Sequence, residues 1–161
     1  IALEVRYAFN MIKHAYLAAG CFWGVEDKLS KLDGVLETEV GYCGGDTLDP
    51  TYRLVCSGDT GHAETVHVEF DENVISFAEI LKVFFDIHDP TQLNRQGFDI
   101  GDNYRSAIFY VDSEQKNTAE EVLKEIGPDF GNMVVTNLEK FSKFFRAEEY
   151  HQKYLAKKRY V

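Results

Sequence analysis

The chain has 161 residues, of which 45% are hydrophobic and 14% are aromatic, so residues 1–161 can bury a sizeable core as a single domain. Its 27 acidic residues outnumber its 17 basic ones and give a formal net charge of −10, which argues against nucleic acid as a partner. Because no apolar run approaches the ~18 residues of a membrane span, we expect a cytoplasmic protein that is not bound to membranes.

The first ten residues, IALEVRYAFN, precede the first regular element. They contain Glu4 and Arg6 and lack an uninterrupted apolar run, so they are unlike a signal peptide. A more regular pattern begins at Met11. We interpret residues 1–10 as a leader, a remnant of cloning or part of a longer chain.

A predicted strand over residues 14–20 leads into a helix whose apolar face contains Phe22, Val25 and Leu29, with Cys21 at the junction. A helix N-terminus offers free N–H groups and partial positive charge, which favour thiolate over thiol. We therefore predict a lowered pKa and a reactive sulfur for Cys21. The competing interpretation is a structural cysteine buried among core aromatics.

A second strand is predicted over residues 35–42, and a glycine-rich loop over residues 43–62. The stretch 64–70 alternates in the manner of a strand, with Val66, Val68 and Phe70 on one side. Ser76 and Glu79 form a capping box at the start of the next helix. A polar loop over 88–104, a strand over 105–111, a helix over 113–127, a strand over 132–141 and a terminal helix over 147–158 complete the chain.

The order β-α-β-β-α-β-α-β contains a split βαβ repeat. It predicts an α/β (α+β) fold with a ferredoxin-like core, in which helices pack against one face of a mixed sheet. The loops at 43–62 and 88–104 are much longer than the usual connection of ~4–6 residues. We expect these two functional loops to converge on Cys21.

The three cysteines of the sequence, Cys21, Cys43 and Cys56, include no C-x-x-C pair, which suits a reducing compartment where one thiol does chemistry. A zinc site that uses Cys43, Cys56, His62 and His67 is a weak alternative, because spacings of 13, 6 and 5 residues match no usual set of ligands. We expect no metal.

Two partners for Cys21 lie in the stretch TGHAETV. A Cys21–His62 pair is typical of a cysteine hydrolase with a histidine base. A Cys21–Glu64 pair would instead combine a thiolate with a carboxylic acid that an apolar pocket keeps neutral, and we predict a raised pKa for Glu64. A third interpretation is a non-enzymatic module that binds peptides in an aromatic pocket.

Four further side chains suit a site for a small polar group with an apolar substituent. Tyr52 and Tyr104 lie in the two long loops and can donate O–H groups to an oxygen. Phe22 and Trp23 can form an apolar box for a methyl or thioether group.

The sequence resembles the A class of peptide methionine sulfoxide reductases. The resemblance covers most of the chain and rests on stretches that occur in the family's order: GCFWGVE, GYCGG, PTYRLVCSGDTGHAE, HDPTQLNRQG and DIGDNYRSAI, with a weaker match in EEYHQKYL. The family has an α/β sandwich fold around a split βαβ core. It reduces the S epimer of methionine sulfoxide, free or in proteins, and thereby repairs oxidative damage.

The resemblance also implies roles for individual residues. Cys21 would attack the sulfoxide sulfur and become a sulfenic acid, while Glu64 would protonate the sulfoxide oxygen. Tyr52 and Tyr104 would hold that oxygen by hydrogen bonds. The remaining implied roles concern the substrate: Phe22 and Trp23 would receive its S-methyl group, and Asp99 would help to bind the peptide.

Regeneration of the thiol is where the sequence departs from the family pattern. Many relatives have resolving cysteines in a glycine-rich C-terminal tail, whereas this sequence ends in AKKRYV without a cysteine beyond Cys56. Cys43, in GYCGG, stands where relatives usually have a non-thiol residue and is a candidate resolving thiol on a flexible loop; the alternative is an unpaired loop cysteine. We predict Cys56 as structural. Thioredoxin, glutaredoxin or a small thiol would supply electrons to a monomeric enzyme that needs no other cofactor.

Overall fold

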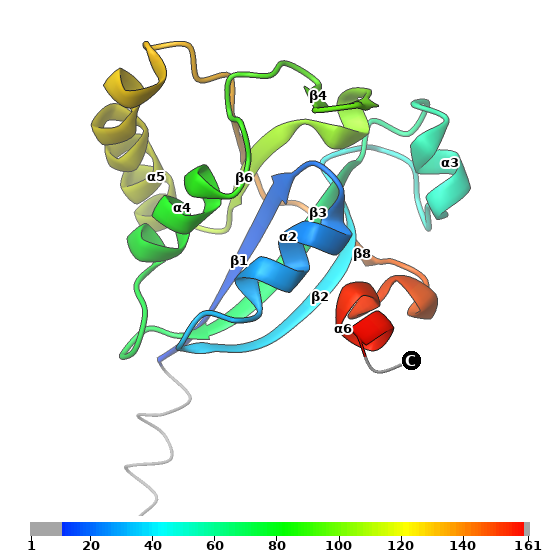
Figure 1. The fold of residues 1–161 in the computed structure, drawn as a ribbon, viewed down its shortest axis with the longest axis horizontal. Helices are drawn as coiled ribbons and strands as arrows, with labels where there is room; N and C mark the ends of the chain where they lie inside the picture. Colours follow the sequence, from blue (N-terminus) through cyan, green and yellow to red (C-terminus); the bar gives the residue numbers. More distant parts are fainter. Residues whose placement is uncertain (1–10, 160–161) are drawn as a thin grey trace, which may run out of the picture.

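The computed structural model describes residues 11–159; residues 1–10, with the predicted leader, and residues 160–161 lie outside the described part. A six-stranded sheet in the order β7-β6-β1-β3-β2-β8 forms the centre of the molecule (Figure 1). Its neighbouring strands are antiparallel except for the parallel pair β6–β7. The strands are β1 (Ile12–Ala19), β2 (Val35–Cys43), β3 (Ala63–Asp71), β6 (Ser106–Tyr110), β7 (Asn137–Lys140) and β8 (Phe144–Arg146).

The helices are α2 (Phe22–Leu29), α3 (Tyr52–Cys56), α4 (Phe77–Asp86), α5 (Ser113–Ile126) and α6 (Tyr154–Arg159). Three 3₁₀ helices, η1 (Asp102–Tyr104), η2 (Gly127–Phe130) and η3 (Glu149–His151), lie between the larger elements. The predicted cap of α4 is confirmed, because the Glu79 backbone N–H donates to the Ser76 hydroxyl at 3.1 Å. No helix within residues 11–159 is long and apolar enough to cross a bilayer.

Successive residues of each strand face opposite sides of the sheet. Ala15, Leu17 and Ala19 of β1 enter the main core, which the sheet shares with α2, α4 and α5. Ala18 enters a smaller core on the other face. Helix α2 therefore lies across the main-core face of the sheet, where Figure 1 shows it in front of β1 and β2. The chain passes from the end of β1 into the start of this helix through a short connection.

The predicted fold class, a mixed sheet with helices packed against it, is confirmed. Both long loops contain elements that periodicity did not reveal: α3 in the first, and in the second η1 and a hairpin of β4 (Arg95–Gln96) with β5 (Asp99–Ile100). The predicted terminal helix over 147–158 is wrong as one element. It divides into η3 and α6 because the backbone is extended at Gln152 and left-handed at Lys153 (φ +52°).

Candidate active site

Cys21 is the residue between β1 and α2, at the N-cap position of the helix. The turn into the helix requires Gly20, whose φ of +93° is left-handed and whose place for a Cβ lies 2.8 Å from the Gln96 Cβ. The Cys21 side chain makes no capping hydrogen bond, but the backbone N–H groups of Trp23 and Gly24 at the helix N-terminus lower its pKa. The predicted position of this sulfur at the N-terminus of a helix is therefore confirmed.

The predicted lowering of the Cys21 pKa is nevertheless wrong for the free protein. Burial, with a smaller contribution from the negative charges of Glu64 and Asp99, outweighs the effect of the two backbone N–H groups and raises the pKa of Cys21 to about 11. The partial positive charge at a helix N-terminus stabilises a thiolate only weakly. Burial removes the water that would solvate the thiolate and therefore disfavours ionisation more strongly. Without substrate, Cys21 is therefore a neutral thiol at pH 7.

This pKa predicts the order in which the thiols react with iodoacetamide. At pH 7 we expect Cys21 to be alkylated about 100-fold more slowly than an ordinary exposed thiol, because a pKa near 11 leaves a very small thiolate fraction. The exposed Cys56 should react first. Peptide mapping by mass spectrometry over a pH series measures both rates. Labelling of Cys21 before Cys56 at pH 7 would contradict the assignment.

Glu64 is a buried carboxylic acid beside the start of α2. Its position on β3 is in phase with Val66 and Val68, so its side chain faces the main core and is only 1% exposed. Glu64 Oε1 accepts the backbone N–H of Phe22 at 3.2 Å, and Oε2 has no hydrogen-bond partner among residues 11–159. Burial raises the pKa of Glu64 to about 8, with a contribution from the charge of Asp99, which confirms the predicted direction.

Tyr52 and Tyr104 complete the polar side of the site from the two long loops. Tyr52 begins α3, and its ring lies 6.3 Å from that of Phe22. Tyr104 ends η1. Burial and the negative charge of Glu64 raise the pKa of both phenols, so both remain O–H donors at neutral pH. The loops therefore converge on Cys21 as predicted.

The apolar side of the site consists of the two aromatics after Cys21. Phe22 is buried against Tyr42 and Tyr52, whereas Trp23 is half-buried. The Trp23 indole N–H donates to His151 Nδ1 at 2.9 Å, and its ring stacks on that of Tyr154 at 4.0 Å. The indole is thus fixed from both its edge and its face.

Asp99 lies on the exposed hairpin strand β5. Its charge raises the pKa of Cys21, Glu64 and Tyr104, so its carboxylate lies close enough to act on all three. An exposed carboxylate at the rim of a largely apolar site can accept hydrogen bonds from an incoming molecule.

Sequence reasoning missed the contribution of the C-terminal segment. Glu148 accepts the Tyr42 hydroxyl at 2.9 Å and the Tyr52 backbone N–H at 3.0 Å, and His151 and Tyr154 hold Trp23. The signal is present in the stretch EEYHQKYL, which the sequence pattern predicts only as part of a terminal helix over residues 147–158. Its polar residues instead support the first turn of α2 and the start of α3.

His62 does not belong to the site. It is buried, its Nδ1 accepts the Gly45 backbone N–H at 3.0 Å, and its Nε2 lies 2.7 Å from the Thr47 carbonyl oxygen. Both ring nitrogens are therefore engaged in holding the loop after β2. His62 is not placed to act as the base of a Cys21 hydrolase.

The prediction that Cys43 lies on a flexible loop is also wrong. Cys43 is the last residue of β2, is 1% exposed, and donates its thiol to the Lys143 carbonyl oxygen at 3.2 Å. Its side chain packs with Ala18 and Ala63 in the smaller core, on the face of the sheet opposite Glu64. The sheet itself separates this thiol from Cys21, so the role of resolving thiol is withdrawn from Cys43.

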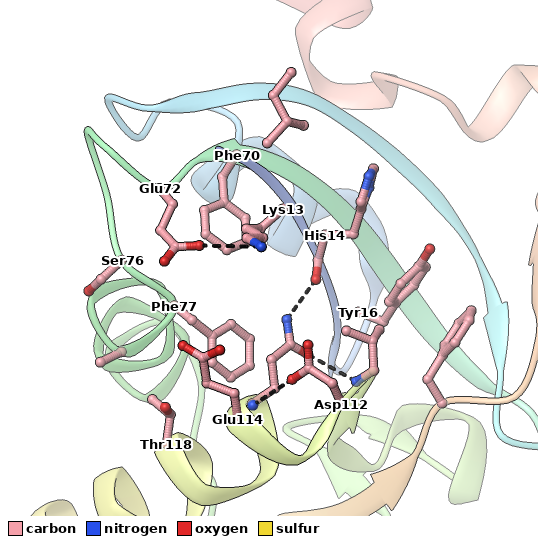
Figure 2. Close-up of a pocket in the computed structure, with 15 residues that line it drawn as sticks. Lys13, His14, Tyr16, Phe70, Glu72, Ser76, Phe77, Asp112, Glu114 and Thr118 are labelled. Carbon is pink, nitrogen blue, oxygen red and sulfur yellow. Dashed lines mark hydrogen bonds and ion pairs between the residues drawn. The ribbon is translucent and has the colours of Figure 1, made fainter. Parts of the chain in front are cut away.

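A cavity of about 420 Å³ lies away from these residues, at the N-terminal end of β1 (Figure 2). Ile12, Phe70 and Phe77 provide apolar lining, and Asp112 and Glu114 at the start of α5 provide acidic groups at its edge. None of the predicted site residues lines this cavity. In the described part of the chain, no three His, Cys, Asp or Glu side chains are grouped so as to hold a metal ion.

Comparison with known proteins agrees with this geometry. The family model for peptide methionine sulfoxide reductase matches residues 13–160. The peptide methionine sulfoxide reductase MsrA of Pelagibacter ubique is 52% identical over 144 residues, which cover 89% of this chain and 98% of that protein. Reduced Mxr1 from Saccharomyces cerevisiae has a TM-score of 0.90 and 37% identity over 94% of this chain and 88% of its own.

A second structure of Mxr1, in complex with Trx2, has a TM-score of 0.66 and 26% identity over 90% of this chain and 86% of its own. The resemblance inferred from the sequence is therefore confirmed over nearly the whole chain. The chain belongs to the peptide methionine sulfoxide reductase family and is an oxidoreductase that reduces methionine sulfoxide to methionine.

Proposed function

We propose that this reductase acts on the S epimer of methionine sulfoxide, free or in oxidised proteins, through nucleophilic attack by Cys21. The observation that carries the proposal is the state of Glu64. This carboxylic acid is buried, has a pKa of about 8, and has an unpartnered Oε2 beside the residue that follows Cys21. A protonated acid next to a nucleophile fits a reaction that needs one proton donor and one soft sulfur.

The proposed reduction transfers an oxygen atom between two sulfurs. Glu64 donates its proton to the sulfoxide oxygen, which Tyr52 and Tyr104 also hold, and the Cys21 sulfur attacks the sulfur made electron-poor in this way. The Cys21 proton passes to the Glu64 carboxylate. The oxygen then moves to the Cys21 sulfur, as the S–O bond of the substrate and the newly formed bond between the two sulfurs break. The products are methionine, whose sulfur has gained two electrons, and Cys21 sulfenic acid, whose sulfur has lost two.

Substrate recognition follows from the two sides of the site. The half-buried Trp23, backed by Phe22, offers an apolar surface to the S-methyl group. Asp99, exposed on β5, accepts a hydrogen bond from the peptide backbone or amino group of the substrate. A methyl group on one side and an oxygen held on the other fix the configuration at sulfur, which supports selectivity for a single epimer.

The reducing equivalents come from thiols. The complex of Mxr1 with Trx2 supports thioredoxin as the reductant of this enzyme, and glutaredoxin and small thiols are the alternatives to compare. The proposed steps use only thiols and one carboxylic acid. We place the enzyme in the cytoplasm, where free thiols persist, and expect it to act as a monomer.

Separate assays of the two sulfoxide epimers test this function. With thioredoxin as reductant, we expect turnover of the S epimer at least about 100-fold faster than that of the R epimer, since the R epimer cannot place both oxygen and methyl correctly. Chromatography of the methionine formed measures both rates. Similar rates would contradict the selectivity, and hydrolysis of an activated ester without sulfoxide reduction would favour the hydrolase alternative.

A further inference from the structure

His151 lies behind both the apolar and the polar side of the candidate active site. It ends the 3₁₀ helix η3 and is 1% exposed. Its ring centre lies 5.3 Å from that of Phe22, 5.6 Å from that of Trp23 and 4.4 Å from that of Tyr52. One buried ring therefore contacts the two aromatics proposed to receive the S-methyl group and a phenol proposed to hold the sulfoxide oxygen.

The hydrogen bond between Trp23 and His151 defines the protonation state of the histidine. An indole N–H can only donate, so His151 Nδ1, which lies 2.9 Å from it, accepts and carries no proton. The single ring proton of the neutral histidine is then on Nε2. Burial lowers the pKa of His151, against a smaller opposing effect of the Glu148 charge, so the ring stays neutral at pH 7.

The other ring nitrogen of His151 is buried without a partner. Its Nε2 has no hydrogen-bond acceptor among residues 11–159, and such a group destabilises a folded protein. The rings of Phe22, Tyr52 and Tyr150 pack around the histidine, and a phenylalanine in its place could pack against them at no such cost. The polar interaction that a histidine adds here is the acceptor for the Trp23 indole.

This acceptor fixes the indole in a way that packing does not. Trp23 is half-buried, and the ring of Tyr154 stacks on its face at 4.0 Å. Stacking is weakly directional, so the face contact alone leaves the indole able to turn in its own plane, whereas a hydrogen bond sets the direction of its edge. With both contacts, the indole is a wall of fixed position on the apolar side of the site.

We propose that His151 is a positioning residue that makes the site selective for a methyl group on the sulfoxide sulfur, an inference that rests on the proposed function. His151 holds the edge of the Trp23 indole, so a larger alkyl group on the sulfur meets a wall that cannot retreat. His151 acts through Trp23 and does not touch the reacting atoms. Its loss should therefore change the discrimination between substrates more than the chemical step.

Two substrates that differ by one methylene test the proposal on the full chain. Turnover of the S epimers of methionine sulfoxide and ethionine sulfoxide is measured for wild type and for His151→Phe. Wild type should prefer the S-methyl substrate at least about tenfold in kcat/KM, because one methylene in a fixed apolar pocket changes binding by this order. His151→Phe should lower this preference at least about fivefold, mainly through a higher KM for methionine sulfoxide, with kcat changed less than about threefold.

Two further variants separate the hydrogen bond from packing. His151→Asn restores an acceptor, because its amide oxygen can take the place of Nδ1, and its preference should stay within about threefold of wild type. Tyr150→Phe is the matched control: it removes a hydroxyl from a ring 4.1 Å from that of His151 and keeps both Nδ1 and the indole bond, so it should behave like wild type. Urea unfolding checks that each variant is folded.

The indole N–H gives a readout that does not depend on activity. Trp23 is the only tryptophan of the sequence, so the protein has a single indole N–H resonance. Its hydrogen exchange should accelerate at least about tenfold in His151→Phe, which lacks the acceptor, and much less in His151→Asn. A role of His151 in packing alone would leave this exchange unchanged.

Four results would overturn the inference while the reductase chemistry stands. They are a wild type without the methyl preference, a folded His151→Phe that keeps it, an equal loss of preference in His151→Asn, and a wild-type nitrogen spectrum in which the His151 proton is on Nδ1 at pH 7. The last does not depend on the folding of any variant. If wild type formed no methionine from the S-sulfoxide, the proposed function would fall together with this inference.

Discussion

Substitution of Cys21 with serine is expected to lower kcat/KM for methionine S-sulfoxide by at least about 10⁴-fold, or between 5 and 6 kcal/mol of transition-state stabilisation by rough conversion. A serine hydroxyl cannot form a soft anionic nucleophile at neutral pH, and it cannot accept the sulfoxide oxygen as a sulfenic acid. Chromatographic measurement of methionine, with thioredoxin as reductant, gives the rate.

The matched control for this substitution is Cys43→Ser, because both variants exchange one sulfur for one oxygen. Cys43 packs in the smaller core, so its variant should lose some stability and retain activity. Folding of Cys21→Ser can be checked by urea unfolding, and its half-buried site should tolerate the hydroxyl. A Cys21→Ser enzyme within tenfold of wild type would show that another group attacks the sulfoxide.

The Glu64→Gln variant is expected to show opposite effects on activity and stability. Loss of the proton donor should lower kcat by about 10²- to 10³-fold, which is less than the effect of Cys21→Ser, because the thiol and both phenols remain. At the same time the variant should gain stability relative to wild type as the pH rises. An equal loss of activity in the two variants would argue against a purely acidic role for Glu64.

The stability effect follows from the raised pKa of Glu64. The folded protein keeps this proton up to a pKa of about 8, while the unfolded chain loses it near 4.5. Between these values the unfolded state binds fewer protons, so the free energy of unfolding of wild type falls as the pH rises, and the decline ends above the folded pKa. Glutamine has no such proton. The difference between variant and wild type should thus grow by about 2 kcal/mol from pH 5 to pH 7.

Urea unfolding of both proteins at pH 5, 6, 7 and 8 measures this difference. Glu69→Gln is the matched control, since Glu69 lies on the same strand, points to the opposite face and is half-buried. Its variant should show a nearly constant difference from wild type over the same range. A constant difference for Glu64→Gln as well would mean that Glu64 ionises normally in the folded protein.

Periodicity and capping predicted most of the fold because they depend on neighbours along the chain. The alternation of Val66, Val68 and Phe70 places Glu64 in phase with the core, so a buried carboxyl could be expected from the sequence. The Ser76 cap was predictable for the same reason, since its partner Glu79 is three residues away. Tyr52 and Tyr104 were selected by their place in the two long loops, and the family motifs added Asp99, which periodicity alone does not select.

The errors concern properties that depend on distant residues. The pKa of Cys21 is set by burial and by Glu64 and Asp99, which reach it through the fold and not along the helix. Cys43 is in a strand because β2 pairs with β8, where it faces Phe144, a residue about 100 positions away. Neither effect can be inferred from the residues that are next to Cys21 or Cys43 in the sequence.

The hydrogen bond from Trp23 to His151 joins residues 128 positions apart. The segment that follows is fastened to the first helix as well, since buried Glu26 accepts both the backbone N–H of Lys153 at 2.8 Å and its ammonium group at 3.1 Å. A chain still emerging from the ribosome can make Cys21 and its helix early but has no support for the indole until residues 148–154 are free to dock. The apolar side of the site is therefore complete only when residues 148–154 have docked against the start of α2.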